Sequence, residues 1–385
     1  MRKEEISVVS VIGAGDMGHG IAQAALLGGL IVYLYDVNEE SLQRGVKKMN
    51  ESFEKLYSKN KISLEEWNEY RSNLHPTLNF SDAVSNSQFV FEAAPEILEI
   101  KQTLFKDMEA LTSSDTILAS NTSNMSISEI AEHVQHKERV VGVHFFNPVV
   151  MMKLAEVIRS QDTSEETMRI AYDLCLKMNK VPVRVEKDSP CFIVNRVNAP
   201  IRVFLGGVVD QKIAEPEEID ALMRFHGHPM GHFELSDYVG LDVLYDSCQY
   251  RERVLHPDYA SFQLLTQKVK AGELGKKTGK GFYDWSNGRP AIDLDRRTDK
   301  INISDLELIK LNEAAKLIEE GVASPKDIDL AMVLGTGDKI GPIEGSKGIN
   351  INNAIARLES IAEQLNKAVL KPTALLKEKP ESIFY

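Results

Sequence analysis

A glycine-rich turn near the start of the chain sets the strongest limit on its fold. Residues 6–12 are a short run rich in β-branched side chains, which predicts a buried strand. A helical pattern over 20–27 and a second strand over 30–35 follow the turn. This order of elements binds the pyrophosphate of a dinucleotide at the helix N-terminus. The residues of the turn predicted to contact the cofactor are Gly13, Ala14, Gly15, Asp16, Met17 and Gly18.

The glycines of the turn have separate roles, and an acidic residue follows them at a useful distance. Gly13 permits the tight turn, Gly15 lets the pyrophosphate approach the backbone, and Gly18 lets helix and strand pack closely. Asp36 ends the second strand 23 residues after Gly13, near the usual spacing for an acceptor of the ribose 2′-hydroxyl. A carboxylate there repels a 2′-phosphate, so Asp36 favours NAD over NADP. The alternative is that Asp36 is only a surface turn residue.

Length and charge define the class of protein around this unit. The chain has 385 residues, which at about 100–200 residues per domain predicts two or three domains. A net charge of −12 argues against a general nucleic-acid or anionic-membrane surface. No long apolar segment is present, and the 3 cysteines are widely spaced. We therefore expect a cytoplasmic protein with reduced thiols, no membrane span and no nucleic-acid partner.

The strand pattern resumes after the first unit. Further strands are expected over 88–93, 116–120 and 139–146. Their alternation with helical segments predicts an α/β fold, a Rossmann-type doubly wound sheet of parallel strands covered on both faces. Ligands of such sheets bind beyond the carboxyl ends of the strands. Polar side chains that directly follow these strands are therefore candidates for the functional site.

His144 is the strongest candidate for a general base. It lies at the end of a predicted strand, and imidazole titrates near neutral pH. Glu156 follows in an apolar stretch, where a carboxylate is costly to bury unless it is paired. A pair between the two would orient the imidazole and raise its basicity. The alternative is a histidine hydrogen-bonded inside the core, with Glu156 facing solvent.

Three other features carry weaker signals. The helical segment 41–74 contains several lysines, which indicate either a solvated surface of mixed charge or a patch for a phosphorylated substrate. The histidines of segment 226–232 have no cysteine or carboxylate at a familiar ligand spacing, so no metal site is expected. Ser123 lacks the turn motif of a nucleophilic serine.

Several motifs occur together in a fixed order between residues 13 and 285. They are GAGDMG at 13–18, FEAAPE at 91–96, SNTS at 120–123, HFFNPVVMMKLAEVI at 144–158, SPCFIVNR at 189–196, GHPMGHFELSDYVGLD at 227–242 and LGKKTGKGFYDW at 274–285. With these motifs the chain resembles the L-3-hydroxyacyl-CoA dehydrogenases of fatty-acid β-oxidation, including the 3-hydroxybutyryl-CoA dehydrogenases. The resemblance implies reversible, NAD-dependent oxidation of a 3-hydroxyacyl-CoA to a 3-oxoacyl-CoA.

The resemblance also implies roles for individual residues. His144 would be the general base and Glu156 its orienting partner, while Ser123 and Asn195 would hydrogen-bond the reacting oxygen of the substrate. Asp36 would hold the adenosine ribose. Further cofactor contacts are implied for Glu96, Lys101 and Lys277, and contacts with the CoA moiety for Ser52 and Lys59.

Two other functions stay open on the sequence alone. One is an NAD-dependent dehydrogenase of a hydroxy acid without CoA, which Ser52 and Lys59 argue against. The other is a non-catalytic dinucleotide-binding protein, which the joint presence of all the implied catalytic residues argues against. The sequence departs from the family pattern at Cys191, where glycine is usual, and at His232, where proline is usual. It predicts neither the acyl chain length nor the direction of the pathway.

The second half of the chain is predicted to be helical, and it contains an internal repeat. Segment 212–234 matches segment 321–344 with an offset of 109 residues, then 110 after one insertion. The alternative, a shared helix start with proline in the first turn, does not account for the later matches. The predicted domains are an NAD-binding domain at 1–186, a helical domain at 187–290 and its second copy at 291–385.

The repeat bears on the oligomeric state. In the family that the chain resembles, a single helical domain usually mediates homodimerisation. The second copy lacks the SPCFIVNR and GKKTGKGFY motifs, so we expect it to carry no catalytic residue. The chain is therefore expected to be a homodimer, or a monomer whose second copy covers the surface that a partner would cover (an internal pseudo-dimer).

Overall fold

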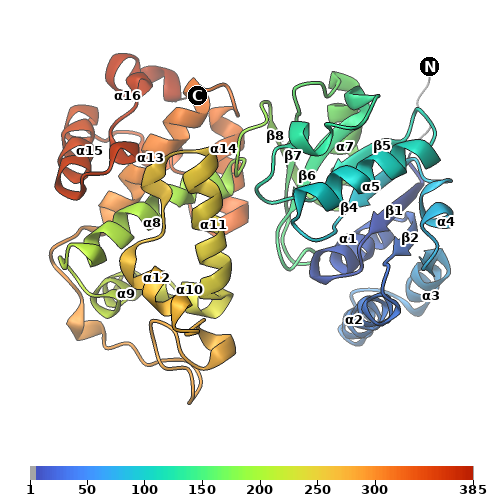
Figure 1. The fold of residues 1–385 in the computed structure, drawn as a ribbon, viewed down its shortest axis with the longest axis horizontal. Coiled ribbons are helices and arrows are strands. Elements are labelled where there is room, and N and C mark those ends of the chain that lie inside the picture. The colour runs from blue at the N-terminus through green and yellow to red at the C-terminus, as the bar shows by residue number, and fades with distance from the viewer. Residues whose placement is uncertain (1–5, 385) are drawn as a thin grey trace. The chain divides into compact units, whose positions relative to one another are not determined.

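The computed structural model describes residues 6–384 and divides the chain into two compact units. The first unit runs to Val194 and includes Gly321–Gly341, and the second combines Asn195–Glu320 with the residues from Pro342 onward. The first unit contains an eight-stranded sheet in the order β3-β2-β1-β4-β5-β6-β7-β8 (Figure 1). The strands are β1 (Val8–Ile12), β2 (Ile31–Tyr35), β3 (Leu74–Thr77), β4 (Phe89–Glu92), β5 (Ile117–Ser120), β6 (Val140–Phe145), β7 (Leu154–Ile158) and β8 (Val181–Val185).

All five strands predicted from the sequence are present, and the doubly wound sheet is confirmed. The prediction of a wholly parallel sheet is wrong at one pair, because β7 runs antiparallel to β6. Residues 146–153 alone join these two strands. A parallel pair needs a crossover of about a dozen residues or more, so this short connection can only turn the chain back. β8 then pairs parallel to β7.

Helices cover both faces of the sheet. Alternate apolar side chains such as Val9 and Val11 of β1 share one core with α1 and with Met168 of α7. The helices of the first unit are α1 (Asp16–Leu27), α2 (Glu39–Ser58), α3 (Leu64–Asn73), α4 (Phe80–Val84), α5 (Leu98–Leu111), α6 (Ile127–Ile130), α7 (Glu165–Lys177) and α14 (Pro325–Thr336).

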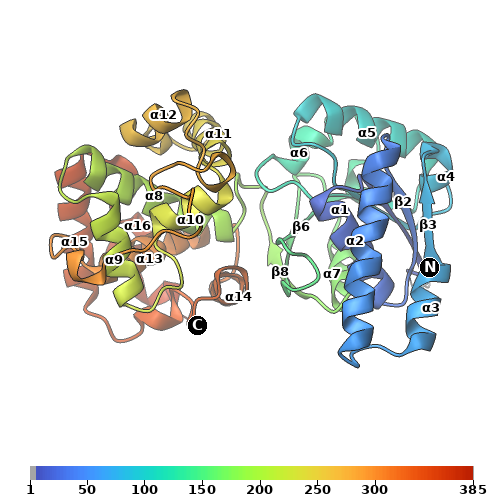
Figure 2. The same cartoon turned by 90° about the horizontal axis from the view of Figure 1, so that it is seen from below.

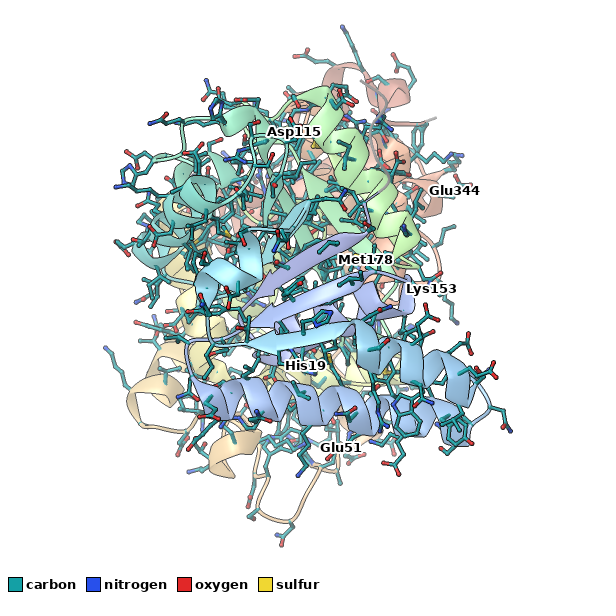
Figure 3. All side chains as sticks on the ribbon, turned by 90° about the vertical axis from the view of Figure 1, so that its right-hand side faces the viewer. His19, Glu51, Asp115, Lys153, Met178 and Glu344 are labelled. Atoms are coloured by element: carbon teal, nitrogen blue, oxygen red, sulfur yellow. The ribbon has the colours of Figure 1, made fainter. Side chains whose placement is uncertain are left out.

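The predicted helical segment 41–74 is divided between α2 and α3, which lie side by side (Figure 2). Asn60, with a φ of 52°, lies in the turn between them. Ser63 then starts α3 with a capping box, because its hydroxyl accepts from Glu66 N at 3.1 Å and its N–H donates to the Glu66 carboxylate at 2.7 Å. Glu51 lies on the exposed face of α2, away from the sheet (Figure 3).

The second unit is helical, as the sequence predicts. The last strand ends at Val185. Within residues 6–384 no helix is long and apolar enough to cross a membrane. The helices of this unit are α8 (Val194–Asp210), α9 (Pro216–Phe225), α10 (His232–Val239), α11 (Leu241–Val254), α12 (Gln263–Lys270), α13 (Ile303–Glu319), α15 (Ile351–Leu365) and α16 (Ala374–Glu378).

The internal repeat has a structural counterpart. A Cβ added to Gly231 would lie 2.2 Å from the carboxylate of Asp220, and one added to Gly341 would lie equally close to that of Asp329. Both copies thus build the same close approach of an aspartate to a glycine that starts the next turn. The second copy is nevertheless shared between the units, because its helix α14 packs on β7 and β8 of the sheet. The compact units therefore do not coincide with the predicted domain boundaries, which stay a prediction.

Candidate active site

The glycine turn between β1 and α1 separates folding roles from a ligand role. Gly13 has a φ of +103°, and a Cβ added to it would lie 2.6 Å from the carbonyl oxygen of Ala93. A Cβ on Gly18 would lie 1.7 Å from the oxygen of Gly13. A Cβ on Gly15 would meet no atom within 4 Å. Folding therefore requires glycine at positions 13 and 18. At Gly15 the free space fits a group that approaches the N-terminus of α1.

Asp36 lies directly against this turn. One of its carboxylate oxygens accepts from Ala14 N at 2.9 Å, and the other accepts from Asn38 N at the same distance. The side chain is half-buried. A carboxylate oxygen has more than one lone pair, so both can still accept from a ribose hydroxyl. The geometry is compatible with the ribose role, which stays a prediction beside the turn alternative.

Asp16 is the first residue of α1, where a carboxylate would oppose a bound phosphate. Its Oδ1 receives a hydrogen bond from Lys48 Nζ of α2 at 2.6 Å. That hydrogen bond, together with the charge of Lys48, lowers the pKa of Asp16. The ammonium group thus neutralises the carboxylate beside the helix N-terminus. Met17 follows Asp16 in the first turn of α1 and packs partly buried against the core.

His144 and Glu156 form a buried pair. The antiparallel register of β6 and β7 sets the two residues directly opposite each other. Their contact is a hydrogen bond of 2.6 Å between His144 Nδ1 and Glu156 Oε2. The histidine is 3% exposed and the glutamate is fully buried. The predicted orienting pair is therefore present in the geometry that a general base needs, and the solvated-glutamate alternative is wrong.

Glu156 also holds the start of α8. Its second oxygen accepts from Ile193 N at 3.1 Å and from Val194 N at 3.0 Å. These donors and the positive end of the helix satisfy the buried carboxylate. Because a carboxylate only accepts, the tautomer that fits this contact carries its proton on His144 Nδ1. His144 Nε2 is then left as an acceptor.

Glu96 connects two of the strand-end loops. Its Oε1 accepts from Thr122 Oγ1 at 2.9 Å and from Ser123 N at 2.8 Å. Lys101 lies 1% exposed beneath this loop and places Nζ 3.2 Å from Glu96 and 2.7 Å from Glu92. Lys101, which was predicted to contact the cofactor, thus pairs with two carboxylates inside the protein. Its contact with the cofactor stays a prediction. Sequence reasoning missed Glu92, whose only signal is its place at the end of β4.

The predicted CoA contacts lie on or next to α2. Ser52 accepts a hydrogen bond of 2.7 Å from Gln23 of α1, and Lys59 is exposed at the C-terminal end of α2. Residues seven apart on a helix lie on the same side, about two turns from each other. The two residues can therefore face one extended ligand.

Two predicted site residues belong to the second unit. Asn195 is half-buried in the first turn of α8, directly after the Val194 that binds Glu156. Lys277 is exposed, and its Nζ forms an ion pair of 2.5 Å with Asp242. This ion pair fixes the segment of the GKKTGKGFY motif to the start of α11.

The two departures from the family pattern have structural consequences. Cys191 has a φ of 68° and the following Phe192 a φ of 56°, both in the left-handed region. Glycine adopts this conformation without the penalty of about 1 kcal/mol that other residues carry, which explains the family preference. His232 is the first residue of α10, where burial and the charge of Arg202 lower its pKa to about 3.

The fold and this site define an NAD-binding dehydrogenase with a histidine–glutamate pair. Two family models match the chain. The NAD-binding domain of 3-hydroxyacyl-CoA dehydrogenase matches residues 8–189, and the C-terminal domain of the same enzyme matches residues 192–285 and 308–382. The chain belongs to the 3-hydroxyacyl-CoA dehydrogenase family, so the predicted family, enzyme class and cofactor are confirmed.

Similar proteins agree with this assignment. A probable 3-hydroxybutyryl-CoA dehydrogenase of Bacillus subtilis is 40% identical over 73% of this chain and 98% of its own length. The fatty acid oxidation complex subunit alpha of Psychrobacter arcticus is 34% identical over 96% of this chain, which spans only 54% of that protein. The crystal structure of a 3-hydroxybutyryl-CoA dehydrogenase from Escherichia coli has a TM-score of 0.90 at 27% identity, with 98% of both chains covered.

Proposed function

We propose that this chain oxidises (S)-3-hydroxyacyl-CoA to 3-oxoacyl-CoA reversibly, with His144 as the general base. The observation that carries the proposal is the buried hydrogen bond between His144 and Glu156 at the carboxyl end of β6. The names of the relatives favour a short acyl chain, since two of the three described above are 3-hydroxybutyryl-CoA dehydrogenases.

The proposed proton transfer uses the free nitrogen of the imidazole. His144 Nε2 accepts the proton of the 3-hydroxyl group, while Glu156 holds the Nδ1 proton and stabilises the imidazolium that forms. The hydroxyl oxygen is positioned by hydrogen bonds from Ser123 and Asn195. Bound NAD supplies the acceptor for the hydride that leaves carbon 3. In the reverse direction, His144 returns the proton to the substrate oxygen.

The remaining roles follow the same proposal. Gly15 and Asp36 hold the pyrophosphate and the adenosine ribose of NAD, and Glu96 orders the Ser123 loop beside the cofactor. Lys277 is proposed as a further cofactor contact, and Ser52 with Lys59 as contacts for CoA. We further propose a cytoplasmic protein that is a homodimer or a monomer with an internal pseudo-dimer. The two stretches matched by the C-terminal family model support a duplication.

The test is NADH oxidation by the purified full chain, with acetoacetyl-CoA, longer 3-oxoacyl-CoA thioesters and the corresponding free acids. Turnover of the thioesters and not of the free acids is expected. His144→Ala should lower kcat by about 10²–10⁴-fold while NADH binding, followed by fluorescence, stays unchanged. Turnover of free acids alone would support the non-CoA alternative, and undiminished turnover by the variant would remove His144 from its role.

A further inference from the structure

The helical unit contains a cavity that none of the proposed catalytic or cofactor contacts lines. It has a volume of about 70 Å³ and lies between α8, α11, the segment that precedes α12 and Lys367, two residues after the end of α15. All of its lining residues belong to the second unit. Its charged and hydroxyl side chains include Arg202, Asp210, Arg251, Asp258, Ser261 and Lys367.

Arg251 is the unusual member of this lining. It lies on α11 and is 6% exposed, yet its Nε is buried with no hydrogen-bond partner. Within residues 6–384 no carboxylate forms an ion pair with it. A buried guanidinium is costly without a counter-ion, because the interior solvates its charge poorly.

The two carboxylates of the lining are already used elsewhere. Asp210 accepts from Gln263 N at 3.0 and 3.1 Å and so caps the start of α12. Asp258 accepts from Val369 N at 3.1 Å and lies 3.4 Å from His256 Nδ1. Both acids therefore hold backbone or histidine groups rather than Arg251. Because Arg202, Arg251 and Lys367 face only these two acids, the lining has an excess of one positive charge.

We propose that this cavity binds a small oxyanion, with Arg251 as its principal ligand. A guanidinium presents a planar fork of donors that matches the oxygens of a phosphate or a carboxylate. Arg202 and Lys367 add positive charge to the same cavity, and the Ser261 hydroxyl, which is hydrogen-bonded to Thr266 at 2.7 Å, is a further polar group there. The shared chemistry is an oxyanion, and its source is either free phosphate or the acid group of a small metabolite.

The experiment measures the thermal unfolding of the full chain while inorganic phosphate or acetate replaces chloride at constant ionic strength. NADH is kept saturating so that the dinucleotide site is filled. The variants are Arg251→Met, which keeps the volume and removes the charge, and Arg253→Met as a matched control. Arg253 lies on the same helix but is exposed. Phosphate also stabilises proteins non-specifically, and comparison of the variants cancels that effect.

In the wild type we expect a saturable rise of Tm with phosphate, with acetate or with both. In Arg251→Met we expect no such rise. Without added oxyanion, Arg251→Met should melt at or above the wild-type temperature, because it removes an unpaired buried charge. Phosphate alone would indicate a phosphoryl group, and acetate alone a carboxylate. If Arg251→Met does not fold, Arg251→Lys should keep the charge and bind at least tenfold more weakly. No saturable response in the wild type, or a response that these variants leave unchanged, would overturn the proposal.

Discussion

Gly15 and Gly18 allow cofactor binding to be separated from folding within one turn. In Gly15→Ala the new methyl group meets no atom within 4 Å, and the residue has a φ of −65°, which alanine adopts freely. The free energy of unfolding should therefore be unchanged or higher by about 0.4–1 kcal/mol. The methyl group occupies the space through which we propose that the pyrophosphate reaches the backbone. If that contact is lost, the loss of one charge-assisted hydrogen bond, about 1.5–3 kcal/mol, weakens NADH binding roughly 10- to 100-fold.

Gly18→Ala should have the opposite profile. Its Cβ would lie 1.7 Å from the Gly13 oxygen, so the backbone of the turn or of α1 must move by more than 1 Å. Overpacking of this kind costs about 1–3 kcal/mol, and we expect Tm to fall together with NADH affinity. Denaturant unfolding without ligand gives the stability of each variant, and fluorescence titration with NADH gives its affinity. Equal stability losses in both variants, or wild-type NADH affinity in Gly15→Ala, would refute the reasoning.

Four further predictions concern single side chains. Glu156→Gln should lower kcat by about 10²–10⁴-fold at unchanged NADH affinity, because an amide has one oxygen and cannot accept hydrogen bonds from both His144 and the two backbone N–H groups. As a control, Glu186→Gln should leave kcat unchanged, since Glu186 is an exposed ion-pair residue at the end of β8. Asp36→Ala should weaken NADH binding about 10- to 100-fold and NADPH binding less, and an unchanged ratio of the two affinities would contradict the ribose role. The pKa of His232 is lowered to about 3, so below pH 6.5 the unfolded chain binds a proton that the folded chain does not. The free energy of unfolding should therefore decrease as the pH is lowered, by at most about 1.4 kcal/mol per pH unit. Denaturant unfolding at pH 4.5–7 should show a smaller decrease in His232→Gln. Gly335→Ala should destabilise the chain by about 1–3 kcal/mol and lower kcat, whereas loss of stability at full kcat would show that α14 does not support the site.

The secondary structure around the glycine turn could be predicted from the sequence. The strand before Gly13, the helix after it and the acid at Asp36 follow from side-chain periodicity and turn chemistry alone. The change from strands to helices in the second half of the chain was also predictable from its helical patterns. Such features depend on neighbours within a few residues, which a single sequence displays directly.

The features that sequence reasoning missed depend on contacts between distant segments. β7 runs antiparallel because the connection at 146–153 is too short for a parallel crossover, and the alternation of strands and helices does not reveal this. Glu92 accepts hydrogen bonds from Lys101 of α5 at 2.7 Å and from Ser120 of the neighbouring strand β5 at 2.6 Å, and no local pattern reveals these contacts. Cys191 adopts a left-handed φ two and three residues before the N–H groups of Ile193 and Val194 that donate to Glu156, and that contact joins segments far apart in the sequence.

The structure also gives a reason why the second helical copy need not carry catalytic motifs to affect the site. Its helix α14 packs on β7 and β8, and Gly335 of that helix approaches the side chains of Leu154 and Val194 so closely that a Cβ would lie 2.8–2.9 Å from them. Val194 donates its N–H to Glu156, and Leu154 lies two residues before Glu156 on β7. The copy therefore packs against the segments that hold the glutamate of the histidine pair. Removal of α14 would expose the strands and the helix start on which that pair depends, so this helix supports the site through packing.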